Sequence, residues 1–515
     1  MAYTVLPEGV SSESFDEALK EYRKILGDDN VLVGLDETVS YRKIMLPIDE
    51  MTVAPSGALM PTSVEEIQAI LKVCNKYKIP VWTISTGKNF GYGSAAPATR
   101  GQMVLDLRRM NKIIEVDPVL CTALVEPGVT YQQLLDHINE KGYNLWVDPP
   151  SPSAIVGPTG NILERGAGYT AYGDHFMMQC GMEVVMADGE ILRTGMGGVA
   201  GSTSWQCFKW GYGPYLDGIF TQSNFGVVTK MGFWLMPKPP IYKPFAVRFA
   251  NLDDIGKIVD LMRGLRMGGL VPGGGIIQSA LYEVAMVNKR HDIYSGPGSI
   301  PDEVVAREAK KLGLGVWNIY AALYGGIQEQ IDVNWKIVTA AFEGIGGVVE
   351  TADDPNMNKK LFARPVAMMS GQMSLEEFGI YNFRGAGGGS MWFAPVAPAK
   401  GEETSKQTAM ARAILSKYGF DYVCGYVVGV RELHHIIDLL FDRSDAVDTR
   451  NAYLCFRELI AEFGKAGYAV YRTGTANMEQ VAEIYGPAQR SVNKKIKRAL
   501  DPNGILAPGK SGITI

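Results

Sequence analysis

The stretch VWTISTGKNFGYGSAAP, residues 81–97, contains the residues that point most directly to chemistry. A short apolar run suited to a β-strand leads into a loop that carries Gly87, Gly91 and Gly93. Glycines let backbone N–H groups approach an anion closely, and successive N–H groups form a concave site for phosphate. The loop has neither GxGxxG before a helix nor the GK[ST] ending of a nucleotide-triphosphate loop. It therefore predicts a diphosphate-bearing cofactor held by a loop, with a glycine-rich surface turn as the alternative.

The composition is that of a large globular protein. The chain has 515 residues, is 46% apolar and carries a net charge of −5, so it can form two or more domains and shows no bias toward nucleic acid or an anionic membrane. No apolar run approaches the roughly 18 residues of a membrane-spanning helix. The N-terminus lacks a secretory pattern, and the six cysteines are widely spaced without a CxxC motif. We therefore expect a cytoplasmic protein with buried free thiols and no metal site.

Alternating strand and helix patterns surround the glycine loop and predict an α+β fold. The first part has helix patterns at 12–26, 62–78 and 131–141, and strand patterns at 81–84, 103–107, 113–116, 122–125, 182–186, 190–193 and 226–236. The long glycine-rich segment 145–176 is too irregular for one element, and such loops are usually functional. The PKPP run at 237–240 marks a plausible domain boundary. Beyond it we expect helices at 252–265, 331–343, 403–418, 432–441 and 453–467, and strands at 314–324, within 381–397 and at 422–430.

With Tyr92 embedded in it, the glycine loop resembles the pyrophosphate loop of the vanillyl-alcohol oxidase and p-cresol methylhydroxylase flavoproteins. The likeness continues through 145–176, through 201–239 and through the tail from YAVYRTGT to APGKSGI, residues 468–512. It implies a two-domain FAD-linked oxidase fold, with an FAD-binding domain of residues 1–240 and 466–515 and a substrate-binding cap domain of residues 241–465. It also implies FAD as the cofactor, a small phenolic substrate and a homodimer.

The resemblance implies a phenol site formed by Tyr92, Tyr471 and Arg472. A para-alkylphenol loses a benzylic hydride more readily as the phenolate, which requires hydrogen-bond donors and positive charge around the phenol oxygen. Two tyrosine hydroxyls and a guanidinium supply both. Taken without the resemblance, each of these residues has an ordinary structural reading.

Further residues are candidates for proton transfer and for the substrate pocket. Asp148, in LWVDPPS, matches an aspartate beside flavin N5 in the oxidase members, and the alternative is an aspartate that forms a turn before Pro149. His434 and Asp438 are four residues apart, so we expect them on one face of a helix, close to the side chain of the substrate. His435 we expect in the core or at the surface, and Asp174 and His175 we do not expect to be catalytic. Glu377, Trp392 and Gly425 match positions that line the family pocket.

Tyr381 matches the tyrosine through which the hydroxylase members bind FAD covalently. The histidine that the oxidase members use aligns with Ser390, so we expect an 8α-O-tyrosyl FAD, with a packed Tyr381 and non-covalent FAD as the alternative. The other expected cofactor-binding residues are Ser85, Thr86, Gly87, Lys88, Asn89, Gly91, Tyr92, Gly157, Gly160, Asn161, Gly226, Arg472 and Lys510.

The implied activity is FAD-dependent oxidation of para-alkylphenols such as 4-ethylphenol, through a para-quinone methide that is then hydroxylated or desaturated. Two electron acceptors fit the sequence. Asp148 and Gly425 favour the oxidase type, which reduces O₂ to H₂O₂, and this is the expectation. The tyrosyl anchor favours the hydroxylase type, a 4-cresol dehydrogenase flavoprotein subunit that passes electrons to a c-type cytochrome. A flavin-binding scaffold and a flavoenzyme for 2-hydroxy acids or sugars are the alternatives from other classes.

Overall fold

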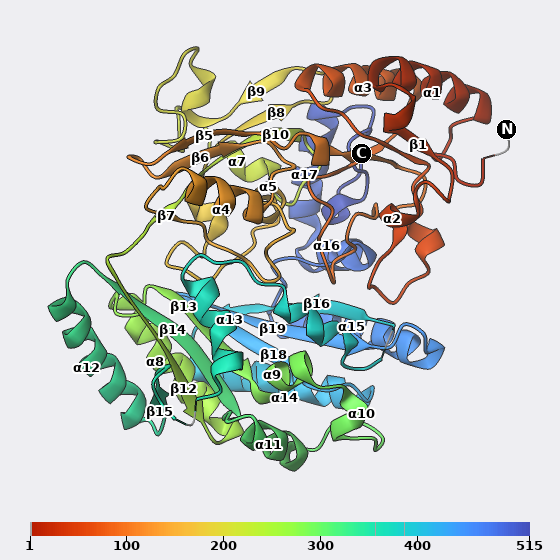
Figure 1. Cartoon of the computed structure of the whole chain (residues 1–515). Coiled ribbons are helices and arrows are strands. Elements are labelled where there is room, and N and C mark those ends of the chain that lie inside the picture. The colour runs from red at the N-terminus through yellow and green to blue at the C-terminus, as the bar shows by residue number, and fades with distance from the viewer. Residues whose placement is uncertain (1–2, 356, 386) are drawn as a thin grey trace.

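A computed structural model describes residues 3–355, 357–385 and 387–515 and shows two parts packed against each other (Figure 1). Both ends of the chain lie in the upper part of the view, and the middle of the chain forms the lower part. The chain enters the lower part after β11 (Met236–Pro237) and leaves it after α15 (Ala446–Lys465). This arrangement is the one we propose as the domain division, with residues 1–240 and 466–515 in one domain and 241–465 in the other. Among the described residues, no helix combines the length and apolarity needed to cross a membrane.

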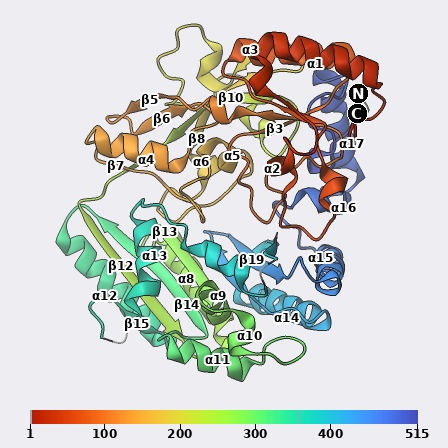
Figure 2. The same ribbon diagram turned by 45° about the vertical axis from the view of Figure 1, so that its right-hand side comes forward.

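A small sheet near the N-terminus carries the glycine loop. Its strand order is β1 (Val31–Val33), β2 (Gly57–Leu59), β4 (Met103–Asp106) and β3 (Val81–Ile84), and the last three strands are parallel. Helices α1 (Ser12–Leu26) and α3 (Val64–Tyr77) pack on it and lie side by side in both views (Figures 1 and 2). Ser63 accepts a hydrogen bond from the Glu66 N–H and caps α3, as its sequence predicts.

A second, antiparallel sheet completes the upper part. Its order is β5 (Ile113–Asp117), β6 (Thr122–Val125), β10 (Val227–Trp234), β8 (Gln179–Val185) and β9 (Ile191–Arg193). Helix α4 (Tyr131–Glu140) begins with a capping box of Thr130 and Gln133 and buries its apolar face against this sheet. The irregular segment 145–176 contains strand β7 (Leu145–Trp146), which pairs with β11, and the short helices α5 (Pro158–Leu163) and α6 (His175–Met178).

The remaining elements of the upper part are short or close to the C-terminus. They are α2 (Val39–Arg42), α7 (Asp217–Phe220), α16 (Met478–Ile484) and α17 (Pro487–Leu500).

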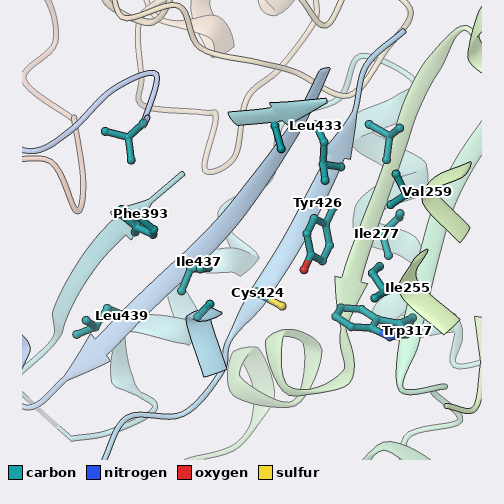
Figure 3. Close-up of a cluster of buried hydrophobic side chains, with 14 of the residues drawn as sticks. Ile255, Val259, Ile277, Trp317, Phe393, Cys424, Tyr426, Leu433, Ile437 and Leu439 are labelled. Atoms are coloured by element: carbon teal, nitrogen blue, oxygen red, sulfur yellow. The ribbon is translucent and has the colours of Figure 1, made fainter. Parts of the chain in front are cut away.

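A large antiparallel sheet organises the lower part. Its order is β15 (Val348–Glu350), β12 (Ile241–Phe249), β14 (Trp317–Gly325), β13 (Gly273–Ser279), β18 (Cys424–Val428), β19 (Glu432–Phe441) and β16 (Gly389–Phe393), and β17 (Val396–Pro398) also pairs with β19. One face packs against helices α8 (Ile255–Met267), α12 (Gln328–Gly344), α14 (Gly401–Lys417) and α15. Figure 3 shows part of this core, where Trp317, Tyr426 and Ile437 point to the same side of the sheet.

The opposite face of the large sheet carries the elements that approach the upper part. They are α9 (Ala280–Val287), α13 (Lys359–Met369) and the 3₁₀ turns of Glu376–Asn382, while α10 (Arg290–Ile293) and α11 (Asp302–Lys311) lie at the outer end. Residues of β14 and β19 alternate between the two faces, as expected for strands. In β19, Leu433, His435 and Ile437 enter the core, so His434 and Asp438 face the other side.

The helix predicted for residues 432–441 is wrong, because they form β19 and pair with β16, β17 and β18. The segment ELHHIIDLLF is a short apolar run, and periodicity does not separate a buried strand from a buried helix at this length. His434 and Asp438 share one face in either case, because residues i and i+4 do so in strands as well as in helices. Their spacing changes, however, from about 6 Å along a helix to about 13 Å along a strand.

Candidate cofactor and substrate site

A cavity opens beside the loop that follows β3. Its lining includes most of the predicted cofactor residues, from five separate segments of the chain. These are Ser85, Thr86, Gly87, Lys88, Asn89, Gly157, Gly160, Asn161, Gly226, Arg472 and Lys510. Three buried side-chain atoms on this wall, Thr159 Oγ1, Ser223 Oγ and Asn224 Oδ1, have no hydrogen-bond partner among the described residues. Unpaired buried polar atoms are costly, so the wall fits a large polar ligand such as FAD.

Two glycines bring α5 against the glycine loop. A Cβ atom on Gly160 would lie 2.3 Å from Ser85 Oγ, and one on Gly157 would lie 2.9 Å from the carbonyl oxygen of Val129. Any side chain at either position would force the two cavity walls apart. Glycine is therefore required at both positions for the two cavity walls to lie this close together.

The opposite wall is held by a buried lysine that sequence reasoning missed. Lys497 is fully buried, and its Nζ donates to the carbonyl oxygens of Asn224 at 2.7 Å and Leu506 at 2.6 Å, beside Asp501 at 2.7 Å. Asn224 and Leu506 both line the cavity. Nothing in the KKIKRAL pattern distinguishes Lys497 from its exposed neighbours, except its place on the apolar face of an amphipathic helix.

Lys510 faces the cavity and is not an exposed tail charge. It forms an ion pair with Glu164, which also lines the cavity, and its side chain is 13% exposed.

A second cavity adjoins the first, and Asn89, Asn161 and Arg472 line both. Tyr92, Tyr471 and Arg472 all line this second cavity, so the structure brings the predicted phenol-binding residues together. Arg472 Cζ lies 3.9 Å from the centre of the Tyr92 ring, and Arg472 Nη2 donates to Asn89 Oδ1 at 2.5 Å. Thr475 N–H donates to the Tyr92 carbonyl oxygen at 3.0 Å and ties the two segments together.

Tyr92 can act as a hydrogen-bond donor in this cluster. Burial raises the pKa of Tyr92 well above its ordinary value, although the charge of Arg472 acts in the opposite direction. Tyr92 therefore keeps its proton at neutral pH and can donate it to a phenolate oxygen, while Arg472 supplies the positive charge.

The rest of the second cavity contains the other predicted pocket residues. Glu377, Tyr381, Trp392 and Gly425 all line it. Gly91 lies behind this wall, where its Cβ would come within 2.3 Å of Trp392 Cδ1. The cavity also has polar lining residues that the sequence did not indicate, namely Ser151, Tyr169, Gln278 and Tyr282.

Asp148 lies outside the lining of both cavities in the described part of the chain. Its carboxylate accepts hydrogen bonds from the N–H groups of Tyr169 at 3.0 Å and Thr170 at 2.8 Å, and from the Thr170 hydroxyl. His175 Nε2 lies 3.0 Å from the same carboxylate. Both oxygens are thus engaged in holding the loop, and Ser151, three residues further on, faces the cavity instead. The expected place of Asp148 beside the flavin stays a prediction, and its neighbours Gly168 and Tyr169 line the second cavity.

His175 and Asp174 are structural in the same loop, as expected. His175 is buried beside Asn161 and Asp148, and the Asp174 side chain caps α6 by accepting from the Met177 N–H.

His434 and Asp438 also lie outside the lining of both cavities, as judged over the described residues. The His434 ring is 4.8 Å from the Tyr471 ring, and burial lowers the pKa of His434. Asp438 is fully buried, and Ser390 Oγ donates to its Oδ1 at 2.7 Å. Burial raises the pKa of Asp438 well above its ordinary value, because a charged carboxylate is poorly solvated there.

His435 is a core residue, one of the two expected outcomes. Its Nε2 lies 2.8 Å from the Tyr422 hydroxyl, and its ring stacks on Tyr426 with ring centres 4.4 Å apart. Burial lowers the pKa of His435 to about 3, so the ring stays neutral.

Comparison with known proteins agrees with this geometry. Residues 55–195 match the FAD binding domain family, and residues 322–511 match the C-terminal domain of FAD linked oxidases. The chain is 54% identical to the flavoprotein subunit of 4-cresol dehydrogenase (hydroxylating) from Pseudomonas putida, over 99% of this chain and 98% of that protein.

Two solved structures have nearly the same fold over the whole chain. A p-cresol methylhydroxylase with substrate bound is 54% identical with a TM-score of 0.97, and a 4-ethylphenol oxidase from Gulosibacter chungangensis in complex with isoeugenol is 36% identical with a TM-score of 0.95. Each match covers 99% of both chains. The chain therefore belongs to the vanillyl-alcohol oxidase and p-cresol methylhydroxylase family of FAD-dependent oxidoreductases.

Proposed function

We propose that this enzyme oxidises para-alkylphenols at the benzylic carbon. The observation that carries the proposal is the convergence of Tyr92, Tyr471 and Arg472 on a cavity that adjoins the cofactor cavity. The names of the relatives, which specify 4-cresol, p-cresol and 4-ethylphenol, support it. FAD, when bound, accepts the hydride.

The residues of the chain act on the phenol oxygen. Arg472 and the two tyrosine hydroxyls hold the substrate as a phenolate, whose electron density assists the departure of hydride from the para carbon chain. The product is a para-quinone methide, which adds water or loses a proton from the next carbon. A site for 2-hydroxy acids or sugars does not need a pair of hydroxyls and a guanidinium around a phenol oxygen.

Anaerobic reduction tests this proposal. Mixing the holoenzyme with 4-ethylphenol should bleach the flavin absorbance without any added acceptor. Bleaching by D-lactate alone would replace the proposal with a 2-hydroxy-acid enzyme, and no bleaching by either compound would indicate a scaffold.

For the acceptor, Asp148 and Gly425 support O₂, although Asp148 is absent from the lining of both cavities in the described part of the chain. The relative with the printed name 4-cresol dehydrogenase (hydroxylating) flavoprotein subunit is 54% identical, against 36% for the 4-ethylphenol oxidase, and the word subunit implies a partner for that protein. We therefore propose a c-type cytochrome as the acceptor and O₂ as the alternative. Rapid release of H₂O₂ by the purified chain during turnover of 4-ethylphenol would reverse this choice.

We also propose that FAD is bound covalently through the Tyr381 oxygen as 8α-O-tyrosyl FAD. Tyr381 is 8% exposed, lines the second cavity and lies beside Phe90 of the glycine loop, with ring centres 6.5 Å apart. Acid-precipitated protein should keep its flavin colour, and the Tyr381→Phe variant should release it. Tyr282→Phe removes a hydroxyl from the same cavity and serves as the matched control, which should keep the colour.

A further inference from the structure

The second cavity has a polar region besides the tyrosine and Arg472 cluster, formed around Arg364. Arg364 is 3% exposed, and its Nη1 donates to Glu377 Oε2 at 3.1 Å while its Nη2 donates to Gln278 Oε1 at 3.3 Å. Glu283 Oε1 lies 3.7 Å from the same guanidinium. Four elements, α9, α13, β13 and the turn at Glu376–Asn382, supply these side chains. We call Gln278, Glu283, Arg364 and Glu377 the carboxylate wall.

Two groups of the carboxylate wall are available to a ligand. Glu377 and Gln278 line the cavity. Glu377 accepts hydrogen bonds from Arg364 and Ser151 through Oε2, and the Tyr282 hydroxyl is a further donor to this carboxylate. A carboxylate has about four lone-pair sites, so Glu377 can still accept a hydrogen bond from a ligand. The Gln278 side-chain nitrogen donates no hydrogen bond to any residue that the structure describes. The wall therefore presents one hydrogen-bond acceptor and one donor to the cavity.

The charge of the wall is balanced within the protein. Glu283 is fully buried, and neither of its carboxylate oxygens has a hydrogen-bond partner among the described residues. Burial raises the pKa of Glu283, while the charge of Arg364 acts in the opposite direction. Arg364 is paired with the Glu377 carboxylate at 3.1 Å whether or not Glu283 is ionised, so no positive charge is left over for an anionic ligand.

The cavity next to the wall is widened by a glycine. Gly425 on β18 is paired with Gln278 on β13, and both line the cavity. Any residue other than glycine would place a side chain beside Gln278. A Cβ on Gly425 would lie 3.0 Å from the Ile277 carbonyl oxygen and 3.7 Å from Gln278 Cγ.

These features orient a substrate and select its side chain. A phenolate oxygen is attracted to Arg472 and repelled by the Glu377 carboxylate, so the para side chain points toward the carboxylate wall. A hydroxyl at the end of that chain can donate to Glu377 and accept from Gln278. A carboxylate there has no proton for Glu377 and meets no free cation. We propose that the enzyme prefers para-alkylphenols whose side chain ends in a hydroxyl group over those that end in a carboxylate, an inference that rests on the proposed phenol oxidation.

Three substrates of equal chain length test this inference: 4-propylphenol, 3-(4-hydroxyphenyl)propan-1-ol and 3-(4-hydroxyphenyl)propanoate. Anaerobic flavin reduction gives a rate constant for each that does not depend on the acceptor. We expect the alcohol to react at least as fast as 4-propylphenol and about tenfold or more faster than the propanoate at low substrate concentration, as one charge-assisted hydrogen bond allows. No reduction by 4-propylphenol would contradict the proposed function itself. Equal rates for the alcohol and the propanoate, with 4-propylphenol active, would overturn the inference alone.

Variants test whether the carboxylate wall causes the preference for a terminal hydroxyl over a carboxylate. Glu377→Gln keeps the shape of the side chain and removes its charge, so the alcohol-to-propanoate ratio should fall toward one. Glu376→Gln, on the exposed side of the same turn, is the matched control and should keep the ratio. If Glu377→Gln lowers the rate of flavin reduction equally for all three substrates, Glu377 has a structural role and the inference is refuted. If Glu377→Gln does not fold, Gln278→Leu removes the donor and should lower the rate with the alcohol selectively.

Discussion

Replacing Arg472 with methionine should remove the charge that holds the phenolate. Arg472 Cζ lies 3.9 Å from the Tyr92 ring centre, so a phenolate oxygen bound beside Tyr92 can lie about 4 Å from the guanidinium. At that distance, with an effective dielectric constant of about 20, the two charges attract by about 4 kcal/mol. If that attraction is lost from the transition state, the rate falls by roughly 10³-fold. Methionine keeps much of the aliphatic length, which limits the loss of packing.

The assay is anaerobic flavin reduction by 4-ethylphenol, with FAD content measured first because Arg472 also lines the cofactor cavity. Part of the loss in Arg472→Met should be recovered near pH 10, where the free phenol ionises in solution. Arg165→Met is the matched control, because Arg165 binds Thr221 and lies outside the lining of both cavities in the described chain. An Arg472→Met enzyme that holds a full complement of FAD and reacts within about threefold of the wild-type rate would refute the electrostatic reasoning.

Three further predictions concern stability. Gly91→Ala should cost about 1–3 kcal/mol and slow flavin reduction, since the added Cβ would meet Trp392 Cδ1 at 2.3 Å and φ is +71°; an unchanged urea midpoint would contradict this. Lys497→Met leaves a buried carboxylate unpaired and should cost about 3–5 kcal/mol in urea unfolding, whereas the exposed Lys494→Met should cost little. Burial lowers the pKa of His435 to about 3, below its value of about 6.5 in the unfolded chain. The unfolded chain therefore binds a proton that the folded chain does not, and the free energy of unfolding should fall by about 2 kcal/mol between pH 7 and pH 5 from this residue. A His435→Gln variant with the same pH slope would contradict that assignment.

Local patterns predicted much of the upper part correctly. The helix α3, the strand before the glycine loop and the strands β4 to β6 all depend on residues close together in sequence. The expected cofactor-binding residues of the glycine loop do line a cavity, and their role in binding stays a prediction. The segment 432–441 was mispredicted because its pairing with β16 and β18, strands on either side of it in the sheet, decides between strand and helix.

The sequence by itself determined the fold family, the cofactor loop and the group of Tyr92, Tyr471 and Arg472, since these are carried by residue identities within short motifs. Only the tertiary structure decided which groups the carboxylates of Asp148 and Glu377 bind. Asp148 turns its oxygens to the N–H groups of a neighbouring loop, while Glu377 reaches the cavity through its pairing with Arg364. The physical reason is that a buried carboxylate must find donors, and those donors come from segments far away in the sequence.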